Sequence, residues 1–138
     1  MRKVIVVDDL EMFRDQIKKD LETQDDFKVI SAYDGINGLE VIKNNQDCSL
    51  IITDLNMPKM DGFKMLESLH KENICIDVPK IILTTEDFLG GSSSDKLLDK
   101  GKTLGVEAWV PKASSSTNQQ DSSLIISGVI KRVLKKRS

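Results

Sequence analysis

The sequence predicts a single α/β domain of the doubly wound type, with a five-stranded parallel sheet between two layers of helices. Two observations predict it. Five short apolar runs, rich in β-branched residues, alternate along the 138 residues with stretches of helical periodicity. The runs are continuous rather than alternately apolar and polar, as expected when helices cover both faces of a parallel sheet. Right-handed crossovers are expected to connect the strands.

The elements follow in order from these patterns. The strands are expected at residues 3–7, 27–33, 49–53, 80–84 and 107–110. Between them, apolar residues recur every three or four positions, which is the spacing of one helix face. The core-facing positions expected on the first, third and last helices are Phe13, Ile17, Leu21, Phe63, Leu66, Leu69, Ile126, Val129, Ile130, Val133 and Leu134. Each strand is therefore expected to be followed by a helix.

Composition narrows the functional classes. The net charge of −2 gives no general attraction to nucleic acid, and no apolar run approaches the ~20 residues of a membrane span. Cys48 and Cys75 lack metal-ligand spacing. We expect one domain over residues 1–138, cytoplasmic and reduced, a monomer or at most a weak dimer, bound neither to nucleic acid nor to membrane. Two polar segments, 90–95 and 113–123, are expected to be flexible loops.

Polar and charged residues gather where the expected strands end. Asp8 and Asp9 follow the first strand, Asp54 the third, Thr84 the fourth and Lys112 the fifth. In an open parallel sheet, ligands bind beyond the carboxyl ends of the strands. Carboxylates converging there repel one another unless a cation lies among them, and oxygen ligands with room for water suit Mg²⁺. The two adjacent Asp would also suit the N-cap of the first helix.

These residue types suit phosphoryl transfer. With a cation present, Asp54 would stay ionised and could attack phosphorus to form an acyl phosphate. Such transfer depends mainly on positioning and charge stabilisation. Lys112 would supply a positive charge for a phosphoryl oxygen, and Thr84 would supply a hydroxyl donor.

Four separated motifs resemble one known family. Asp8-Asp9, TDLNMPKMDG, ILTTE and EAWVPK stand in the order seen in the receiver domains of two-component response regulators, which have a CheY-like fold. The resemblance implies a flavodoxin-like strand order 2-1-3-4-5 and a phosphoacceptor, Asp54, supplied by a sensor histidine kinase. The side chains or carbonyls implied to bind Mg²⁺ belong to Asp9, Asp54 and Asn56, with Asp8 acting through water. The residues implied to switch together on phosphorylation are Thr84 and Trp109, and Lys112 matches the lysine of the family pattern.

Three departures from the family pattern affect the site. Ala113 follows Lys112 where the family usually has Pro, so a trans bond is expected there. Trp109 is larger than the usual Tyr or Phe, and we expect it to be restricted to an outward position. Thr85 replaces a smaller residue and is expected to narrow access to the acceptor.

Other functions fit less well. An FMN carrier of similar fold would not place two Asp where its phosphate loop lies. A phosphatase of the haloacid dehalogenase class needs an acidic residue at position 56, which here is Asn. A non-phosphorylated pseudo-receiver would be expected to lack an acid or the lysine.

We therefore expect a stand-alone response regulator that assists its own phosphorylation but is not otherwise an enzyme. Phosphorylation would change the face of the fourth helix, fifth strand and fifth helix, which would bind a protein partner in trans. The partner is either a flagellar switch, as in chemotaxis, or a histidine phosphotransfer protein in a phosphorelay. Asn56 and Glu86 resemble the chemotaxis group.

Overall fold

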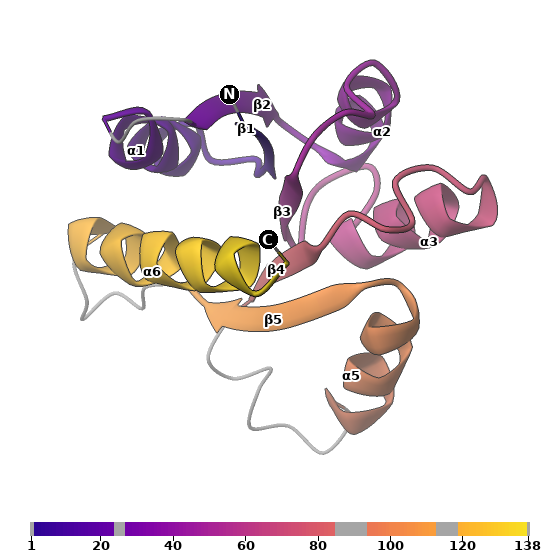
Figure 1. The fold of residues 1–138 in the computed structure, drawn as a ribbon. Helices are drawn as coiled ribbons and strands as arrows, with labels where there is room; N and C mark the ends of the chain where they lie inside the picture. The colour runs from indigo at the N-terminus through magenta and orange to yellow at the C-terminus, as the bar shows by residue number, and fades with distance from the viewer. Residues whose placement is uncertain (1, 24–26, 85–93, 113–118, 138) are drawn as a thin grey trace.

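The computed structural model describes residues 2–23, 27–84, 94–112 and 119–137, in which strands and helices alternate (Figure 1). The strands are β1 (Arg2–Val7), β2 (Phe27–Ala32), β3 (Leu50–Asp54), β4 (Lys80–Thr84) and β5 (Val106–Pro111). The helices are α1 (Glu11–Glu22), α2 (Gly35–Lys43), α3 (Gly62–Lys71), α5 (Ser94–Thr103) and α6 (Gln119–Arg137). The predicted alternation of five strands with helices is confirmed.

All five strands are parallel and lie in the order β2-β1-β3-β4-β5, as predicted. The winding reverses between β1 and β3, which are hydrogen-bonded neighbours. The register aligns the carboxyl ends of the strands, since Val7 pairs with Thr53, Asp54 with Leu83, and Thr84 with Pro111. The residues that end β3 and β4 and those that follow β1 and β5 therefore meet at one edge of the sheet.

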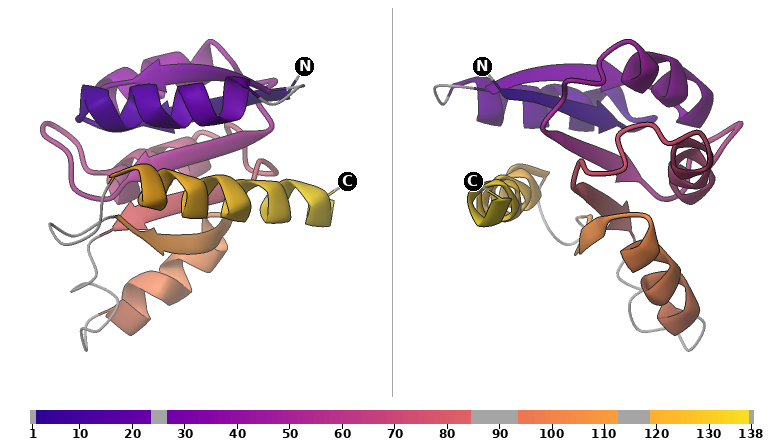
Figure 2. Two further views of the ribbon diagram at one scale, coloured as in Figure 1. Left: turned by 90° about the vertical axis from the view of Figure 1, so that its left-hand side faces the viewer. Right: turned by 45° about the vertical axis from the view of Figure 1, so that its right-hand side comes forward.

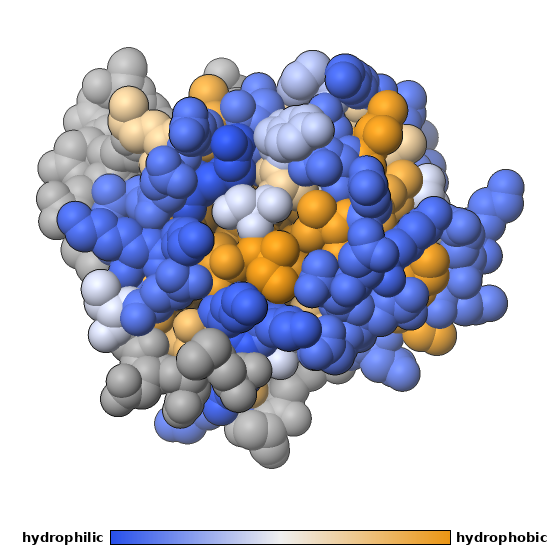
Figure 3. Space-filling view, turned by 90° about the horizontal axis from the view of Figure 1, so that it is seen from above, coloured by the Kyte–Doolittle hydropathy of each residue, from blue (hydrophilic) through white to orange (hydrophobic). Residues whose placement is uncertain are grey.

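The helices form one layer on each face of the sheet (Figure 2). α1 and α6 cover one face, and the buried side chains of α1 are Phe13, Ile17 and Leu21, as predicted. α2, α3 and α5 cover the other face. Every residue of β3 and β4 is buried, while the edge strands β2 and β5 are partly exposed. Seen from the β2 side, the surface is mostly hydrophilic around a central hydrophobic area (Figure 3).

The predictions for α3 and α6 are also confirmed. Phe63, Leu66 and Leu69 are buried in the core between α3 and the sheet. On α6, three residues are buried and two are half-buried at the predicted positions; the buried ones are Ile126, Ile130 and Leu134. None of the helices in the described ranges has the length and apolar character needed to cross a membrane.

Both polar segments that were predicted to be flexible loops are helical where the structure describes them. α5 begins at Ser94 and α6 begins at Gln119, so residues 94–95 and 119–123 are helical. The prediction failed because polar residues such as Gln, Asp and Ser are tolerated in the first turns of a helix, where hydrophobic periodicity is not needed. Residues 90–93 and 113–118 lie outside the described ranges.

The turn between β3 and α3 holds the helix close to the end of the strand. The Gly62 N–H donates to the Leu55 carbonyl oxygen at 2.9 Å, and the Asp61 carboxylate caps α3 by accepting from the Lys64 N–H at 2.7 Å. A Cβ at Gly62 would overlap the Asp54 carbonyl oxygen and would lie 2.8 Å from Thr53 Oγ1. Because backbone atoms cannot yield as a side chain can, only glycine fits at the start of α3.

This close approach predicts opposite effects for two glycine substitutions. Gly62→Ala should lower the free energy of unfolding by about 1–3 kcal/mol, since the new methyl group must displace the backbone. Gly128→Ala should raise it by up to about 1 kcal/mol, because Gly128 is exposed within α6, with open space around its Cα. Urea denaturation of both variants measures the difference, and equal effects would contradict this view of the turn.

Candidate functional site

Three carboxylates converge at the carboxyl edge of the sheet. Asp8, Asp9 and Asp54 each place an oxygen within 4.8 Å of the others. Asp54 is the last residue of β3, and Asp8 directly follows β1, so the two central strands bring them together. Asp8 and Asp54 are buried, whereas Asp9 is exposed. The cluster predicted from the strand ends is therefore present, with one side open to solvent.

Asp8 is fixed by the backbone around it. Its N–H donates to the Ala32 carbonyl oxygen at 3.0 Å, and its Oδ1 accepts from the Leu10 N–H at 2.9 Å. Arg14 Nη1 donates to the Asp8 carbonyl oxygen at 2.6 Å. The expectation that Asp8-Asp9 caps α1 was wrong, because Leu10 occupies the N-cap position without a side-chain cap. The Asp8 carboxylate instead closes the turn before the helix and faces the cluster.

Lys112 reaches into the cluster from the end of β5. Its Nζ lies 2.7 Å from Asp8 Oδ2 and 3.1 Å from Asp54 Oδ2. Its backbone N–H donates to the Thr84 carbonyl oxygen at 2.7 Å, which extends the β4–β5 ladder to this residue. The sheet thus positions one ammonium between two buried carboxylates, at the edge of the sheet where Lys112 was predicted to lie.

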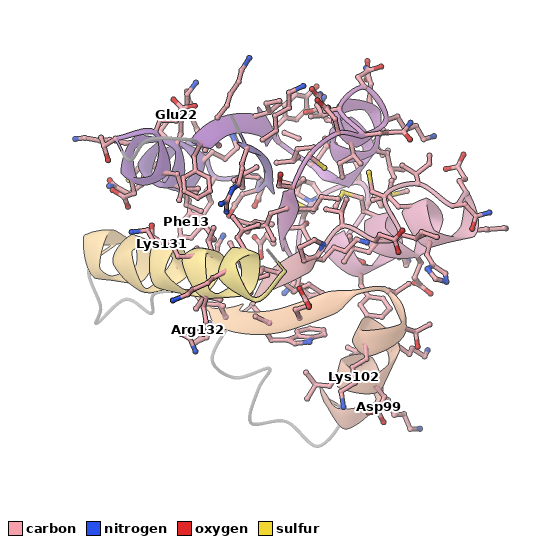
Figure 4. The ribbon with its side chains drawn as sticks, in the orientation of Figure 1. Phe13, Glu22, Asp99, Lys102, Lys131 and Arg132 are labelled. Carbon is pink, nitrogen blue, oxygen red and sulfur yellow. The ribbon has the colours of Figure 1, made fainter. Side chains whose placement is uncertain are left out.

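A residue that the sequence did not single out for the site also contacts Lys112. The Phe13 ring centroid lies 4.5 Å from Lys112 Nζ, within the range of a cation–π interaction. Phe13 projects from the first turns of α1 toward α6 and is buried in the core (Figure 4). Sequence reasoning assigned it to the core alone, although its place at the start of the helical stripe was a signal that it lies nearest the site.

Burial and the Lys112 ammonium have opposite effects on the pKa values of the buried carboxylates. Burial raises the pKa of both Asp8 and Asp54 above the ordinary value of 3.8, and the Lys112 ammonium acts against that rise in each case. Neighbouring carboxylates raise these pKa values further. The charge of Asp54 raises the pKa of Asp8, and the charge of Asp9 raises the pKa of Asp54. Lys112 therefore compensates only part of the cost of keeping these carboxylates charged.

Thr84 presents an unused hydroxyl beside this cluster. It ends β4, is buried, and its Oγ1 has no hydrogen-bond partner within the described residues. A buried hydroxyl without a partner costs free energy, so its presence is consistent with a ligand atom that accepts its hydrogen bond. Three carboxylate oxygens and a nearby hydroxyl together match a site for a hard divalent cation such as Mg²⁺ and an anion.

For Asn56 and Trp109, which were also predicted for the site, the structure gives a position but no contact that tests their predicted roles. Asn56 is exposed on the turn after β3, and the role of its carbonyl oxygen as a metal ligand stays a prediction. Trp109 on β5 is half-buried and packs toward α5, where a Cβ at Gly101 would lie 2.9 Å from its Cζ2. The predicted outward position of Trp109 is thus only partly observed. Thr85, Glu86 and Ala113 lie outside the described residues.

The chain matches known sequences of one kind. The model of the response regulator receiver domain matches residues 4–118. A chemotaxis protein CheY homolog of Campylobacter jejuni is 34% identical over 84 residues, which cover 61% of this chain and 65% of that protein. A protein-glutamate methylesterase/protein-glutamine glutaminase of Lawsonia intracellularis is 35% identical over 81% of this chain, but only 29% of its own length is matched. The chain thus spans less than two thirds of the length of these relatives.

Solved structures give the same result. The chemotaxis response regulator CheY4 of Vibrio cholerae superposes with a TM-score of 0.74 at 27% identity, covering 96% of this chain and 98% of that one. A response regulator receiver domain protein from Clostridium thermocellum superposes with a TM-score of 0.69 at 28% identity, covering 96% of each chain. With this fold, the cluster at its carboxyl edge and the matched family model, the chain belongs to the receiver domains of response regulators.

Proposed function

We propose that this chain is a phosphoacceptor response regulator that takes a phosphoryl group onto Asp54 from a phosphohistidine of a sensor histidine kinase. The observation that supports it best is the arrangement around Lys112, whose Nζ contacts both Asp8 and Asp54 at the edge where Thr84 has an unused hydroxyl. Nucleophile, cation and hydroxyl donor are the parts that phosphoryl transfer needs.

The proposed step uses the carboxylate of Asp54 as the nucleophile. One of its oxygens attacks phosphorus, the phosphorus–nitrogen bond to the histidine breaks, and an acyl phosphate remains on Asp54. Lys112 Nζ, already 3.1 Å from Asp54 Oδ2, is placed to contact a phosphoryl oxygen. Thr84 is placed to donate its hydroxyl to another. Each group stabilises negative charge on the transferred phosphoryl group.

The residues that would hold Mg²⁺ are Asp8, Asp9, Asp54 and the carbonyl of Asn56. When bound, Mg²⁺ supplies positive charge that offsets the repulsion between the carboxylates and the phosphoryl oxygens. Asp9 is the exposed member of the cluster, so it gives the ion a route from solvent. The three carboxylates fit the preference of Mg²⁺ for oxygen ligands.

The chain is proposed to store the phosphoryl group rather than to turn over a separate substrate. A phosphatase with an Asp nucleophile would need a general acid two residues later, and an amide at Asn56 cannot donate a proton in that role. The phosphorylated chain would therefore persist long enough to act as a signal.

The proposed output face comprises α5, β5 and α6. Trp109, Asp99 and Lys102 border a surface hollow of about 500 Å³ between α5 and β5. A second hollow between β5 and α6 includes Glu107 and Arg132. Figure 4 shows Asp99 and Lys102 on α5, on the side of β5 away from α1, and Arg132 on α6 beside β5. Because a chemotaxis protein CheY homolog is among the similar sequences, the proposed partner is a protein of a chemotaxis-like pathway, bound in trans.

Replacement of the acceptor gives the direct test. With Mg²⁺ and a small acyl phosphate donor, the parent chain should gain one phosphoryl group in intact-mass measurements, and hydroxylamine should remove it. Asp54→Asn should abolish the gain, since an amide is not a nucleophile of this kind. Asp61→Asn, which preserves the cap of α3, is the matched control and should behave as the parent. Equal phosphorylation of the Asp54 variant would refute the assignment.

The raised pKa values predict how stability depends on pH and metal. Between 3.8 and the raised pKa values of Asp8 and Asp54, the folded chain binds more protons than the unfolded chain. The metal-free protein should therefore lose stability as the pH rises through this window. At pH 7, Asp8→Asn should raise the melting temperature by a few degrees, on the order of 1 kcal/mol, because it removes a buried like charge.

Mg²⁺ should remove the higher stability that Asp8→Asn is expected to have in the metal-free state. Mg²⁺ at a hundredfold excess over its dissociation constant should stabilise the parent chain by about 2.7 kcal/mol, and should stabilise Asp8→Asn much less. Asp15→Asn removes the same charge from the exposed face of α1 and should leave the response to Mg²⁺ unchanged. Thermal melts at several Mg²⁺ concentrations measure all three proteins, and identical metal responses would contradict the proposed site.

The single tryptophan reports on the proposed switch. Phosphorylation should change Trp109 emission, because its half-buried ring lies between β5 and α5. Gly101→Ala should shift the emission to longer wavelength even without a donor, since the added methyl group would meet the indole. Emission that stays constant while the mass shows full phosphorylation would exclude Trp109 from the switch.

A further inference from the structure

The chain's two cysteines lie at the end of the sheet opposite the acidic cluster. Cys48 is in the turn between α2 and β3, and Cys75 is in the turn between α3 and β4. Both are free thiols that pack in the core on the α2 and α3 side of the sheet. Cys48 is buried and Cys75 is half-buried. Neither has a part in the proposed phosphoryl transfer.

The two turns are packed against each other. Cys75 Sγ lies 3.8 Å from the carbonyl oxygen of Gln46, two residues before Cys48. The Ile51 N–H donates to the Pro79 carbonyl oxygen at 3.1 Å, which joins the segments that follow the two turns. Both thiols belong to the core cluster on this face of the sheet, and each affects the pKa of the other. The two turns that carry the cysteines are therefore neighbours at this end of the sheet.

The backbone of Cys75 is held in one conformation. Its φ of 53° lies in the left-handed region that non-glycine residues rarely adopt. Its carbonyl oxygen accepts from Lys80 Nζ at 2.6 Å and from the Val78 N–H at 3.1 Å. Since these bonds fix the residue, the Cys75 side chain is kept in the turn that faces Cys48.

The two thiols differ in pKa and in exposure because their surroundings differ. Burial raises the pKa of Cys48 to about 12, and the neighbouring Cys75 adds to that rise. Burial also raises the pKa of Cys75, but the Cys48 thiol and the Lys80 ammonium both oppose the rise. Cys75 is also the more exposed of the two. The more exposed Cys75, which has the Lys80 ammonium beside it, is the better placed to attack, and the buried Cys48 is the better placed to resolve.

Cys48 also has access to solvent along one side. It lines a hollow of about 340 Å³ together with Ser49, Val78 and Pro79. Water can therefore reach the surface beside Cys48.

We propose that Cys48 and Cys75 form an intramolecular disulfide when the protein meets a peroxide, so that this pair of turns is an oxidation site. The Cys75 thiolate attacks one oxygen of hydrogen peroxide, the oxygen–oxygen bond breaks and hydroxide leaves, giving a sulfenic acid on Cys75. The Cys48 sulfur then attacks the Cys75 sulfur. The sulfur–sulfur bond forms as the sulfur–oxygen bond breaks, and the departing hydroxide takes the Cys48 proton as water. Two electrons pass from the thiols to the peroxide.

The crosslink would close a loop that contains β3, Asp54 and α3. A disulfide that closes a loop of this size restricts the unfolded chain and stabilises the fold. The oxidation site stands on the two turns alone and holds whether or not Asp54 accepts a phosphoryl group.

Oxidation of the reduced full chain with an equal amount of hydrogen peroxide tests the proposal. The intact mass should fall by two hydrogen atoms, both thiols should resist alkylation after unfolding, and digestion should yield one linked peptide pair. Dithiothreitol should restore both thiols. The melting temperature of the oxidised chain should exceed that of the reduced chain by roughly 10 °C. Added oxygen without a crosslink, or a dimer joined through Cys75, would overturn the proposal.

Two variants test the order of attack. In Cys48→Ala, Cys75 should gain one oxygen and should form a mixed disulfide with added glutathione. In Cys75→Ser, Cys48 should remain a free thiol, with a rate of oxidation at least tenfold below that of Cys75 in the parent. Equal oxidation of Cys48 in the parent and in Cys75→Ser would overturn the assignment of Cys75 as the attacking thiol. The measurements on the parent chain stand even if a variant folds poorly.

Discussion

The placement of one ammonium between two buried carboxylates is the constraint on which the rest of this site depends. Two like charges within 5 Å repel by about 3 kcal/mol at an effective dielectric constant of 20. Asp8 and Asp54 are both buried within such a distance, and Lys112 contacts each of them. That contact opposes the rise that burial causes in the pKa of both carboxylates.

Several features of the fold serve this one placement. β4 separates β3 from β5, so Lys112 must cross the end of β4 to reach Asp54. The bond from its N–H to the Thr84 carbonyl oxygen sets the direction in which the side chain leaves β5. Phe13 then contributes the face of its ring to the same ammonium from α1. Three carboxylates and one ammonium leave a formal charge of −2, which is the charge that one divalent cation would neutralise.

The sequence predicted those parts of the site that depend on strand ends. Asp54, Thr84 and Lys112 could be placed together because parallel strands bring their carboxyl ends to one edge. The position of Phe13 at the start of the helical stripe indicated only that it lies near the site, since its contact with Lys112 depends on how α1 is rotated about its axis relative to β5. The position of Trp109 depends on the absence of a side chain at Gly101, in a different element. The starts of α5 and α6 were placed too late because polar residues at a helix N-terminus carry no periodic signal.

The close packing at Gly62 restricts movement of Asp54 on one side only, the side of α3. The main chain of Asp54 lies directly against the start of α3, where not even a methyl group could be added. The acceptor residue is therefore fixed on its α3 side, and a group added to its carboxylate cannot be accommodated by retreat toward that helix. If Asp54 is phosphorylated as proposed, the added group would lie on the open side near Asp9 and beside Thr84 and Lys112, away from α3. In the proposed switch, the start of α3 would therefore stay in place, and any shift would occur at the carboxyl ends of β4 and β5.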